Sequence, residues 1–233
     1  MIIERRKAVS LLSGGLDSNV ATLLAMNEFD VSLAITFDYG QRAAPREIET
    51  ARSLCEKLKI EHKTIDLPWL GDATPTALVN RVKPIPSTRP ELLEDGADAR
   101  AAKVWVPNRN GVFIATAAAF AESLDLNLII AGFNAEEAKT FSDNSAAFVA
   151  AANAALRLST RSGVSISGPL IKMGKVEIAE RFVALNMDPE MFWCCYDGGE
   201  KMCGLCESCA RTIRAFRDIG AWELISRRFE KVY

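Results

Sequence analysis

Ala8-Val-Ser-Leu-Leu-Ser13-Gly14-Gly15-Leu16-Asp17-Ser18 is the stretch of this chain that says most about its fold. An apolar run ends in Ser-Gly-Gly, and residues with helical spacing follow at once. Glycines let a backbone approach a ligand closely, and Asp17 and Ser18 suit the cap and first turn of a helix. Backbone N–H groups and the positive end of a helix would then meet at the tip of a strand, a natural site for phosphate.

Other phosphate-binding loops do not fit this stretch. No Gly-Lys-Ser/Thr follows the glycines, and G-x-G-x-x-G is absent, so it is neither a Walker A loop nor a dinucleotide fingerprint. It resembles the Ser-Gly-Gly-x-Asp-Ser pyrophosphate loop of ATP pyrophosphatases, which release pyrophosphate and form an adenylate. Ser-Gly-Gly alone would favour an ordinary glycine turn; the whole motif after a strand favours the loop. The expected ATP-binding residues are Leu12, Ser13, Gly14, Gly15, Leu16, Asp17, Ser18, Asn19 and Val20.

Length and composition bound the remaining possibilities. The 233 residues suit one domain with an appended element, or two small ones, and 49% hydrophobic residues suffice for a core. A net charge of −2 argues against a surface built to grip nucleic acid. No apolar run is long enough to span a membrane, and residues 1–7 lack the apolar core of a signal peptide. We therefore expect a cytoplasmic protein without direct nucleic-acid or membrane partners.

Strand-like and helix-like segments alternate along most of the chain. This alternation predicts an α/β fold, a Rossmann-like doubly wound parallel sheet that binds ligands beyond the carboxyl ends of its strands. The expected strands are Lys7–Leu12, Val31–Phe37, Glu61–Leu67, Leu126–Ala131 and Val164–Ser167. The expected helices are Asp17–Glu28, Glu47–Leu58, Val112–Leu124, Ser145–Ser159 and Lys175–Leu185.

One segment, Pro68–Lys103, breaks this alternation. It holds five prolines and shows no clean period. The segment is either an excursion over the mouth of the site, partly mobile, or a passive surface loop.

Five of the six cysteines lie between Cys194 and Cys209. Two residues lie between Cys203 and Cys206 and two between Cys206 and Cys209, and four thiolates suit a closed tetrahedral zinc site. Spacing does not decide whether Cys194 or Cys195 is the fourth ligand. A redox pair, an iron–sulfur cluster and a zinc module that recruits a partner are alternatives. The sixth cysteine, Cys55, is most simply a buried apolar residue.

The motifs occur in the order seen in the 7-cyano-7-deazaguanine synthase family, which the chain resembles over nearly its whole length. The matching residues are the loop at 13–18, Tyr39-Gly40-Gln41-Arg42, Val106-Pro107-Asn108-Arg109-Asn110, Gly132-Phe133-Asn134, Cys195-Tyr196 and the cysteine run with Arg211. The resemblance implies a PP-loop (HUP-type) nucleotide-binding domain at 1–185 and a small helical element at 186–233. That element would hold one zinc ion per subunit through Cys195, Cys203, Cys206 and Cys209, because the family's Ser-Cys-Tyr aligns with Cys194-Cys195-Tyr196.

The implied reaction converts 7-carboxy-7-deazaguanine and ammonia to 7-cyano-7-deazaguanine (preQ0), with ATP and Mg²⁺. The product would be used in the biosynthesis of queuosine or archaeosine in tRNA. A homodimer is implied as well, and Phe216, Trp222 and Phe229 could serve its interface or the core. The expected catalytic residues are Asp17, Ser18, Arg109 and Lys175. The expected residues for the purine-like edge or Mg²⁺ are Asn110, Asn134 and Asp143, with Arg109 as a charge partner. For Lys175 a solvated position on its helix is an equal alternative.

The chain departs from the family in two places. Ala43 stands where the family usually has His, and Phe141-Ser142-Asp143-Asn144-Ser145 replaces Tyr-Pro-Asp-Cys-Arg. These changes leave open a related deazapurine as substrate, or a reaction that stops at the amide. Two other functions also remain, a PP-loop enzyme that acts on a tRNA base and a non-enzymatic nucleotide-binding zinc module.

Overall fold

A five-stranded parallel sheet forms the centre of the computed structural model, which describes residues 5–231. The strands are β1 (Lys7–Leu11), β2 (Asp30–Asp38), β3 (Glu61–Asp66), β4 (Leu128–Ile130) and β5 (Ser165–Ser167), in the order β3-β2-β1-β4-β5. All four strand pairings are parallel. The strand order reverses between β1 and β4, so the ligand crevice of such a sheet lies beyond these two strands. The predicted fold class is confirmed.

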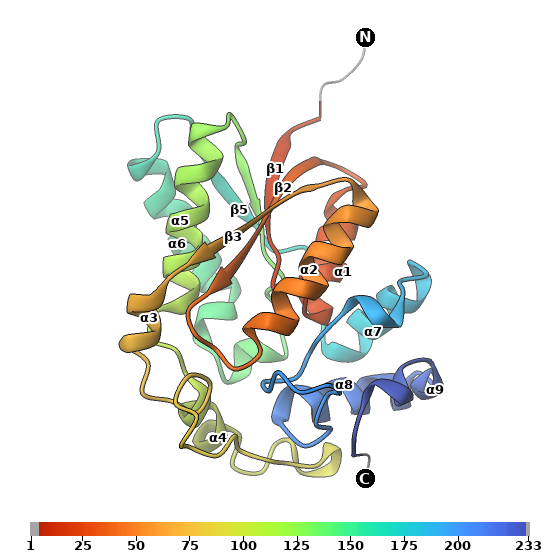
Figure 1. Cartoon of the computed structure of the whole chain (residues 1–233). Coiled ribbons are helices and arrows are strands. Elements are labelled where there is room, and N and C mark those ends of the chain that lie inside the picture. The colour runs from red at the N-terminus through yellow and green to blue at the C-terminus, as the bar shows by residue number, and fades with distance from the viewer. Residues whose placement is uncertain (1–4, 232–233) are drawn as a thin grey trace.

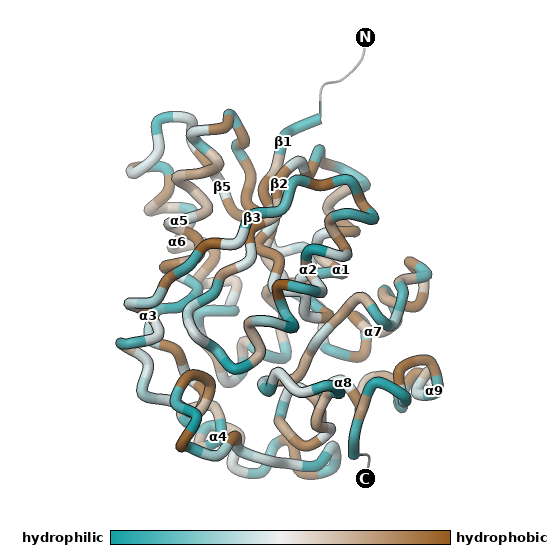
Figure 2. The backbone as a smooth tube through the Cα atoms, in the orientation of Figure 1, coloured by the Kyte–Doolittle hydropathy of each residue, from teal (hydrophilic) through white to brown (hydrophobic). Residues whose placement is uncertain are grey.

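Helices cover both faces of the sheet (Figure 1). α1 (Leu16–Ala25) and α2 (Ala44–Leu58) pack on one face, and α5 (Arg109–Ser123) and α6 (Ala146–Ser159) on the other. Neighbouring strand residues point to opposite faces, so Ala8 joins the first core and Val9 the second. The central strands are accordingly hydrophobic on both sides, as their colour in Figure 2 shows.

Most predicted elements are confirmed, with ends that differ by a few residues. The expectation of a segment without regular structure at Pro68–Lys103 is wrong in part, because it contains α3 (Pro68–Asp72) and most of α4 (Ala97–Val104). Helices of five and eight residues are too short to show a clear period. Short 3-10 turns complete the chain: Pro90–Leu92, Glu137–Lys139, Ser142–Asn144, Pro189–Met191 and Ser226–Arg228.

The C-terminal part adds α7 (Lys175–Ala184), α8 (Glu207–Asp218) and α9 (Trp222–Ile225). They pack beneath α1 and α2 around the fully buried rings of Phe182, Phe192 and Phe216. Phe182 meets the other two rings edge-on, with centroids 5.4 and 5.6 Å apart. Phe216 and Phe229 are thus core residues, and Trp222 packs against Phe229. The division at residues 185 and 186 stays a prediction.

Two sequence-based expectations concern membranes: that the chain has no signal peptide and no membrane-spanning segment. Residues 1–4, which form more than half of the stretch considered for a signal peptide, lie outside the described residues. From residue 5 to 231, no helix combines the length and hydrophobicity needed to cross a bilayer.

Candidate active site

The loop between β1 and α1 is packed tightly on both sides. Gly14 has a φ of +73°, and a Cβ atom there would lie 2.7 Å from the Glu47 carbonyl oxygen on α2. On the other side, a Cβ at Gly132 would lie 2.7 Å from the Ser18 backbone nitrogen. Both positions therefore require glycine, and the loop is held between α2 and the end of β4.

Asp17 lies at the start of α1, where its carboxylate has two unlike oxygens. Oδ2 accepts hydrogen bonds from Lys175 Nζ at 2.5 Å and from Asn134 Nδ2 at 3.3 Å. Oδ1 is buried and has no hydrogen-bond partner among residues 5–231. Burial raises the Asp17 pKa to about 6, against the opposing effect of Lys175. A buried carboxylate oxygen without a partner is suited to accept a ligand, such as Mg²⁺ or a donor group.

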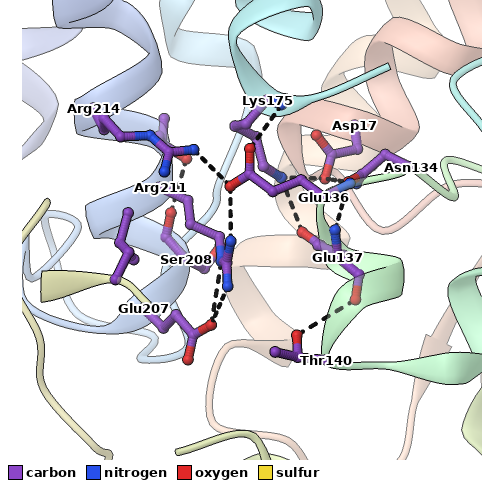
Figure 3. Close-up of polar contacts among 12 residues, drawn as sticks. Asp17, Asn134, Glu136, Glu137, Thr140, Lys175, Glu207, Ser208, Arg211 and Arg214 are labelled. Atoms are coloured by element: carbon purple, nitrogen blue, oxygen red, sulfur yellow. Dashed lines mark hydrogen bonds and ion pairs between the residues drawn. The ribbon is translucent and has the colours of Figure 1, made fainter. Parts of the chain in front are cut away.

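Lys175, the first residue of α7, bridges two carboxylates (Figure 3). Its ammonium group also donates to Glu137 Oε1 at 2.9 Å, and its side chain is only 3% exposed. Burial alone would raise the pKa of Glu137, but Lys175, Arg211 and Arg109 outweigh it and lower that pKa to about 2. The same carboxylates raise the Lys175 pKa. The alternative of a solvated Lys175 is therefore wrong.

Two adjoining cavities open at the carboxyl ends of the strands. Trp105, Phe141, Asp143 and the segment Trp193–Tyr196 line the first cavity only. The ends of β1 and β2, Phe113 and Gly132–Phe133 line the second cavity only. The residues that line both cavities are Ser13, Asp17, Tyr39, Gln41, Glu47, Arg109 and Glu137. This shared wall is the place where two ligands could react. Leu78 also borders the first cavity, so the segment Pro68–Lys103 reaches the site.

Arg109 is the cation of the shared wall. Burial opposes its charge, but the neighbouring Tyr39, Asp143 and Glu47 outweigh burial and raise the pKa of the guanidinium. Burial in turn raises the Glu47 and Asp143 pKa values. The site thus combines the positive charges of Arg109 and Lys175 with three carboxyl groups of raised pKa, those of Asp17, Glu47 and Asp143.

The other predicted site residues divide into two groups. Leu12, Ser13, Gly15, Leu16 and Ser18 line a cavity, as do Asn110 and Asp143, and Asn110 Nδ2 donates to the Asp143 carbonyl. In contrast, Gly14, Asn19, Val20 and Asn134 are absent from both cavity linings. Val20 is buried in the core, and Asn19 donates to the Met191 carbonyl at 2.6 Å. Asn134 holds the turn after β4, because its Oδ1 accepts from the backbone of Glu136 and Glu137.

Sequence reasoning missed three acidic residues of this site. Glu136 and Glu137 follow Gly132-Phe133-Asn134 after one intervening alanine, beyond the end of a predicted strand, and their place at the carboxyl edge was a usable signal. Glu47 carried no such signal, because it reads as an ordinary first-turn helix residue.

The predicted metal ligands come together beside the first cavity. The Sγ atoms of Cys195, Cys203, Cys206 and Cys209 lie within 4.8 Å of one another, and those of Cys203 and Cys209 are 3.9 Å apart. A tetrahedral zinc ion with Zn–S bonds of about 2.3 Å would place its sulfurs about 3.8 Å apart. Backbone N–H groups of Leu205 and Cys206 point at Cys203 Sγ, both at 3.3 Å. The four cysteines therefore fit a closed zinc site.

The remaining cysteines lie outside this set. Cys194 turns toward Met202, with the two sulfur atoms 3.3 Å apart. Cys55 is buried in the core, as expected.

Comparisons with known proteins indicate the same family as the sequence motifs. The family model of the queuosine biosynthesis protein QueC matches residues 7–220. The 7-cyano-7-deazaguanine synthase of Methanosarcina barkeri is 48% identical over 227 residues, 95% of this chain and 98% of that protein. The enzyme of the same name from Pelotomaculum thermopropionicum is 45% identical over 216 residues, 92% of this chain and 98% of its own. Among solved structures, NMN synthetase from Francisella tularensis is 18% identical, with a TM-score of 0.44 and coverage of 96% of this chain and 76% of that one.

Proposed function

We infer the roles of the site residues from the premise that this chain belongs to the family of the queuosine biosynthesis protein QueC. Like its curated relatives, it is an enzyme that makes 7-cyano-7-deazaguanine, and it uses ATP to do so. The observation that carries the chemistry is Asp17, near the end of the pyrophosphate loop and at the start of α1, held by the buried Lys175.

The substrate's carboxylate is a poor electrophile and must first be activated. We propose that its oxygen attacks the α-phosphorus of ATP, so that pyrophosphate leaves and an acyl adenylate forms. Ammonia displaces AMP to give the amide. The amide oxygen is then activated in the same way by a second ATP, and loss of AMP and two protons leaves the nitrile.

The two cavities suggest a division between the substrates. The second cavity, at the ends of β1 and β2, suits the adenosine of ATP, since it lies beside the pyrophosphate loop at the switch point of the sheet. The first cavity suits a planar deazapurine, because the rings of Trp105 and Phe141 are stacked at its wall, with their planes within 4° of parallel. The residues that line both cavities then face the α-phosphate and the attacking oxygen.

Cations and backbone N–H groups would stabilise the charge that develops on the phosphates. We assign phosphate binding to the loop Ser13–Ser18, with Arg109 and Lys175 as charge partners. The buried Oδ1 of Asp17 fits Mg²⁺, which would neutralise the leaving pyrophosphate. Asn134 acts through its hydrogen bond to Asp17.

The deazapurine would be recognised by the acidic and amide groups of the first cavity and its wall. Asp143 and Glu47 can accept hydrogen bonds from a purine-like edge, and Asn110 orders the Asp143 backbone. Arg109, buried among them, is the available partner for the substrate's carboxylate, and the only arginine that lines either cavity in residues 5–231. It would take over from the family's arginine that Ser145 replaces.

The four-cysteine site would be structural, because four thiolates leave no open position on zinc. Bound zinc would stabilise a C-terminal segment with few regular elements. We further propose a homodimer, and a cytoplasmic location in keeping with six cysteines of which none forms a disulfide. Free ammonium in solution would serve as the nitrogen source.

The test is a mass-resolved assay. Zinc-replete protein is incubated with ATP, Mg²⁺, ammonium and 7-carboxy-7-deazaguanine, while pyrophosphate and the deazapurine products are measured. We expect the nitrile and two molecules of pyrophosphate per nitrile. Accumulation of the amide alone would restrict the enzyme to the first activation, and absence of both products would refute the proposed reaction. Light scattering of the same sample tests the dimer.

A further inference from the structure

Ion pairs and one backbone hydrogen bond link Glu207 on α8 to Asp17 (Figure 3). This chain of contacts begins on α8, whose N-cap is the predicted zinc ligand Cys206 and whose first turn carries Cys209. Glu207 Oε1 accepts from Arg211 at 2.6 Å, and Arg211 donates onward to Glu136 Oε1 at 2.7 Å. The side chains of Arg211 and Glu207 are 6% and 3% exposed.

Glu136 is the junction of this chain. Its Oε2 accepts from the Lys175 backbone N–H at 3.1 Å, which satisfies one of the free donors at the start of α7. Its Oε1 is held by Arg211 and by Arg214, both at 2.7 Å. One carboxylate thus joins the turn after β4, the first residue of α7 and helix α8.

The same contacts set the position of the Lys175 ammonium group. Lys175 is anchored at its backbone by Glu136 and at its Nζ by Asp17 and Glu137. Glu136 and Glu137 are neighbours, and both backbone N–H groups bind the Asn134 side chain. If Glu136 shifts, the contact to the Lys175 backbone shifts with it, and so does the neighbouring Glu137 that holds Nζ.

We propose that Arg211 and Glu136 are positioning residues for the ATP reaction, which hold Lys175 at Asp17 and so couple the cysteine cluster to the pyrophosphate loop. Neither residue lines either of the two cavities of the site, so each acts through Lys175. The role rests on the proposed function, since it concerns the geometry of that reaction. The four ligands fix where α8 begins, and Arg211 transmits that position to the site.

The test compares Arg211→Met, Arg211→Lys and Glu136→Gln with the unaltered enzyme. We expect kcat for pyrophosphate release to fall at least tenfold in Arg211→Met and Glu136→Gln, with the KM for ATP changed less than threefold and zinc retained at one ion per chain. Arg211→Lys should recover part of the lost kcat, because it keeps the charge but not the fork. Arg228→Met is the matched control, since Arg228 has a side chain only 12% exposed and pairs with Glu190, outside this chain of contacts.

A second readout does not depend on turnover. Acetic anhydride is reacted with each protein, and modification of Lys175 is measured by peptide mass relative to the exposed Lys172. Lys175 should become at least fivefold more reactive in Arg211→Met and Glu136→Gln, and unchanged in Arg228→Met. Zinc-loaded variants with kcat within twofold of the unaltered enzyme and a still-protected Lys175 would overturn the proposal.

Two further outcomes are also decisive. If Arg211→Met does not fold, Glu136→Gln alone decides in the same way. If the unaltered enzyme makes no product, the proposed function fails, and the labelling of Lys175 still decides whether Arg211 positions it.

Discussion

Replacing Asp17 by asparagine should stabilise the protein at neutral pH while it abolishes turnover. The Asp17 side chain is only 18% exposed, and its partial burial raises its pKa from an ordinary 3.8 to about 6. The fold therefore favours the protonated acid, whereas the reaction needs the carboxylate. Asparagine has nearly the same shape and carries no charge, so the fold no longer opposes an ionisation at this position.

The size of the effect follows from the two pKa values. At about 1.4 kcal/mol per pKa unit, a rise from 3.8 to about 6 corresponds to a loss of about 3 kcal/mol. Because the Asp17 pKa is raised, the part of the folding free energy that depends on protonated Asp17 is fully present below pH 3.8. This part is lost as the pH rises through about 6. The gain in Asp17→Asn should be about 3 kcal/mol at pH 8 and about half of that at pH 5.

The measurement is urea unfolding of zinc-replete protein at pH 5 and pH 8. Glu137→Gln is the matched control, because Glu137 shares Lys175 but its pKa is lowered, from 4.5 to about 2. Its stabilising effect is present above pH 4.5 and is lost as the pH falls through about 2. Glu137→Gln should therefore cost about 3 kcal/mol at both pH values. If Asp17→Asn is less stable than the unaltered protein at pH 8, the ion pair with Lys175 outweighs burial and the reasoning fails.

Three other predictions concern the loop, the cysteines and the pH profile. Gly132→Ala should raise the KM for ATP at least tenfold, because the added Cβ would lie 2.7 Å from the backbone of the pyrophosphate loop. The control Gly168→Ala, whose Cβ would meet its nearest atom at 3.5 Å, should leave the KM for ATP unchanged. An equal rise in KM for both variants would contradict this prediction. Cys206→Ser should lower zinc content and soluble yield together, whereas Cys194→Ser should keep one zinc ion per chain in metal analysis; loss of zinc in the second would place Cys194 in the site. The value of kcat/KM should rise with pH through a midpoint near 6, the pKa of Asp17 in the free enzyme, and a flat profile from pH 5 to 7 would exclude Asp17 as the group that must ionise.

The fold and the two main motifs were predictable because their signals are local. The pyrophosphate loop and the cysteine run each lie within a short stretch, and alternating segments suffice for a parallel sheet. The choice of Cys195 over Cys194 came only from the resemblance, since spacing allowed both. In the structure Cys195 joins the cluster of four sulfurs and Cys194 does not.

Contacts between distant elements were not predictable in this way. Lys175 could have been solvated, because nothing in its own helix shows that Asp17 and Glu137 lie beside it. Glu136 and Arg211 are 75 positions apart in the sequence and meet only because α8 packs beside α7. Charged residues that are buried by tertiary packing show no periodicity of their own.

The ion pairs at Lys175 also imply an order of events during protein synthesis. Asp17 leaves the ribosome before the last strand, which ends at Ser167, and Lys175 and Arg211 follow that strand. Because chains fold from the N-terminus as they are made, the sheet can form while Asp17 and Glu137 still lack their shared cation. A growing chain therefore holds an incomplete pyrophosphate site, and the capacity to split ATP arises only after Lys175 and Arg211 have been made.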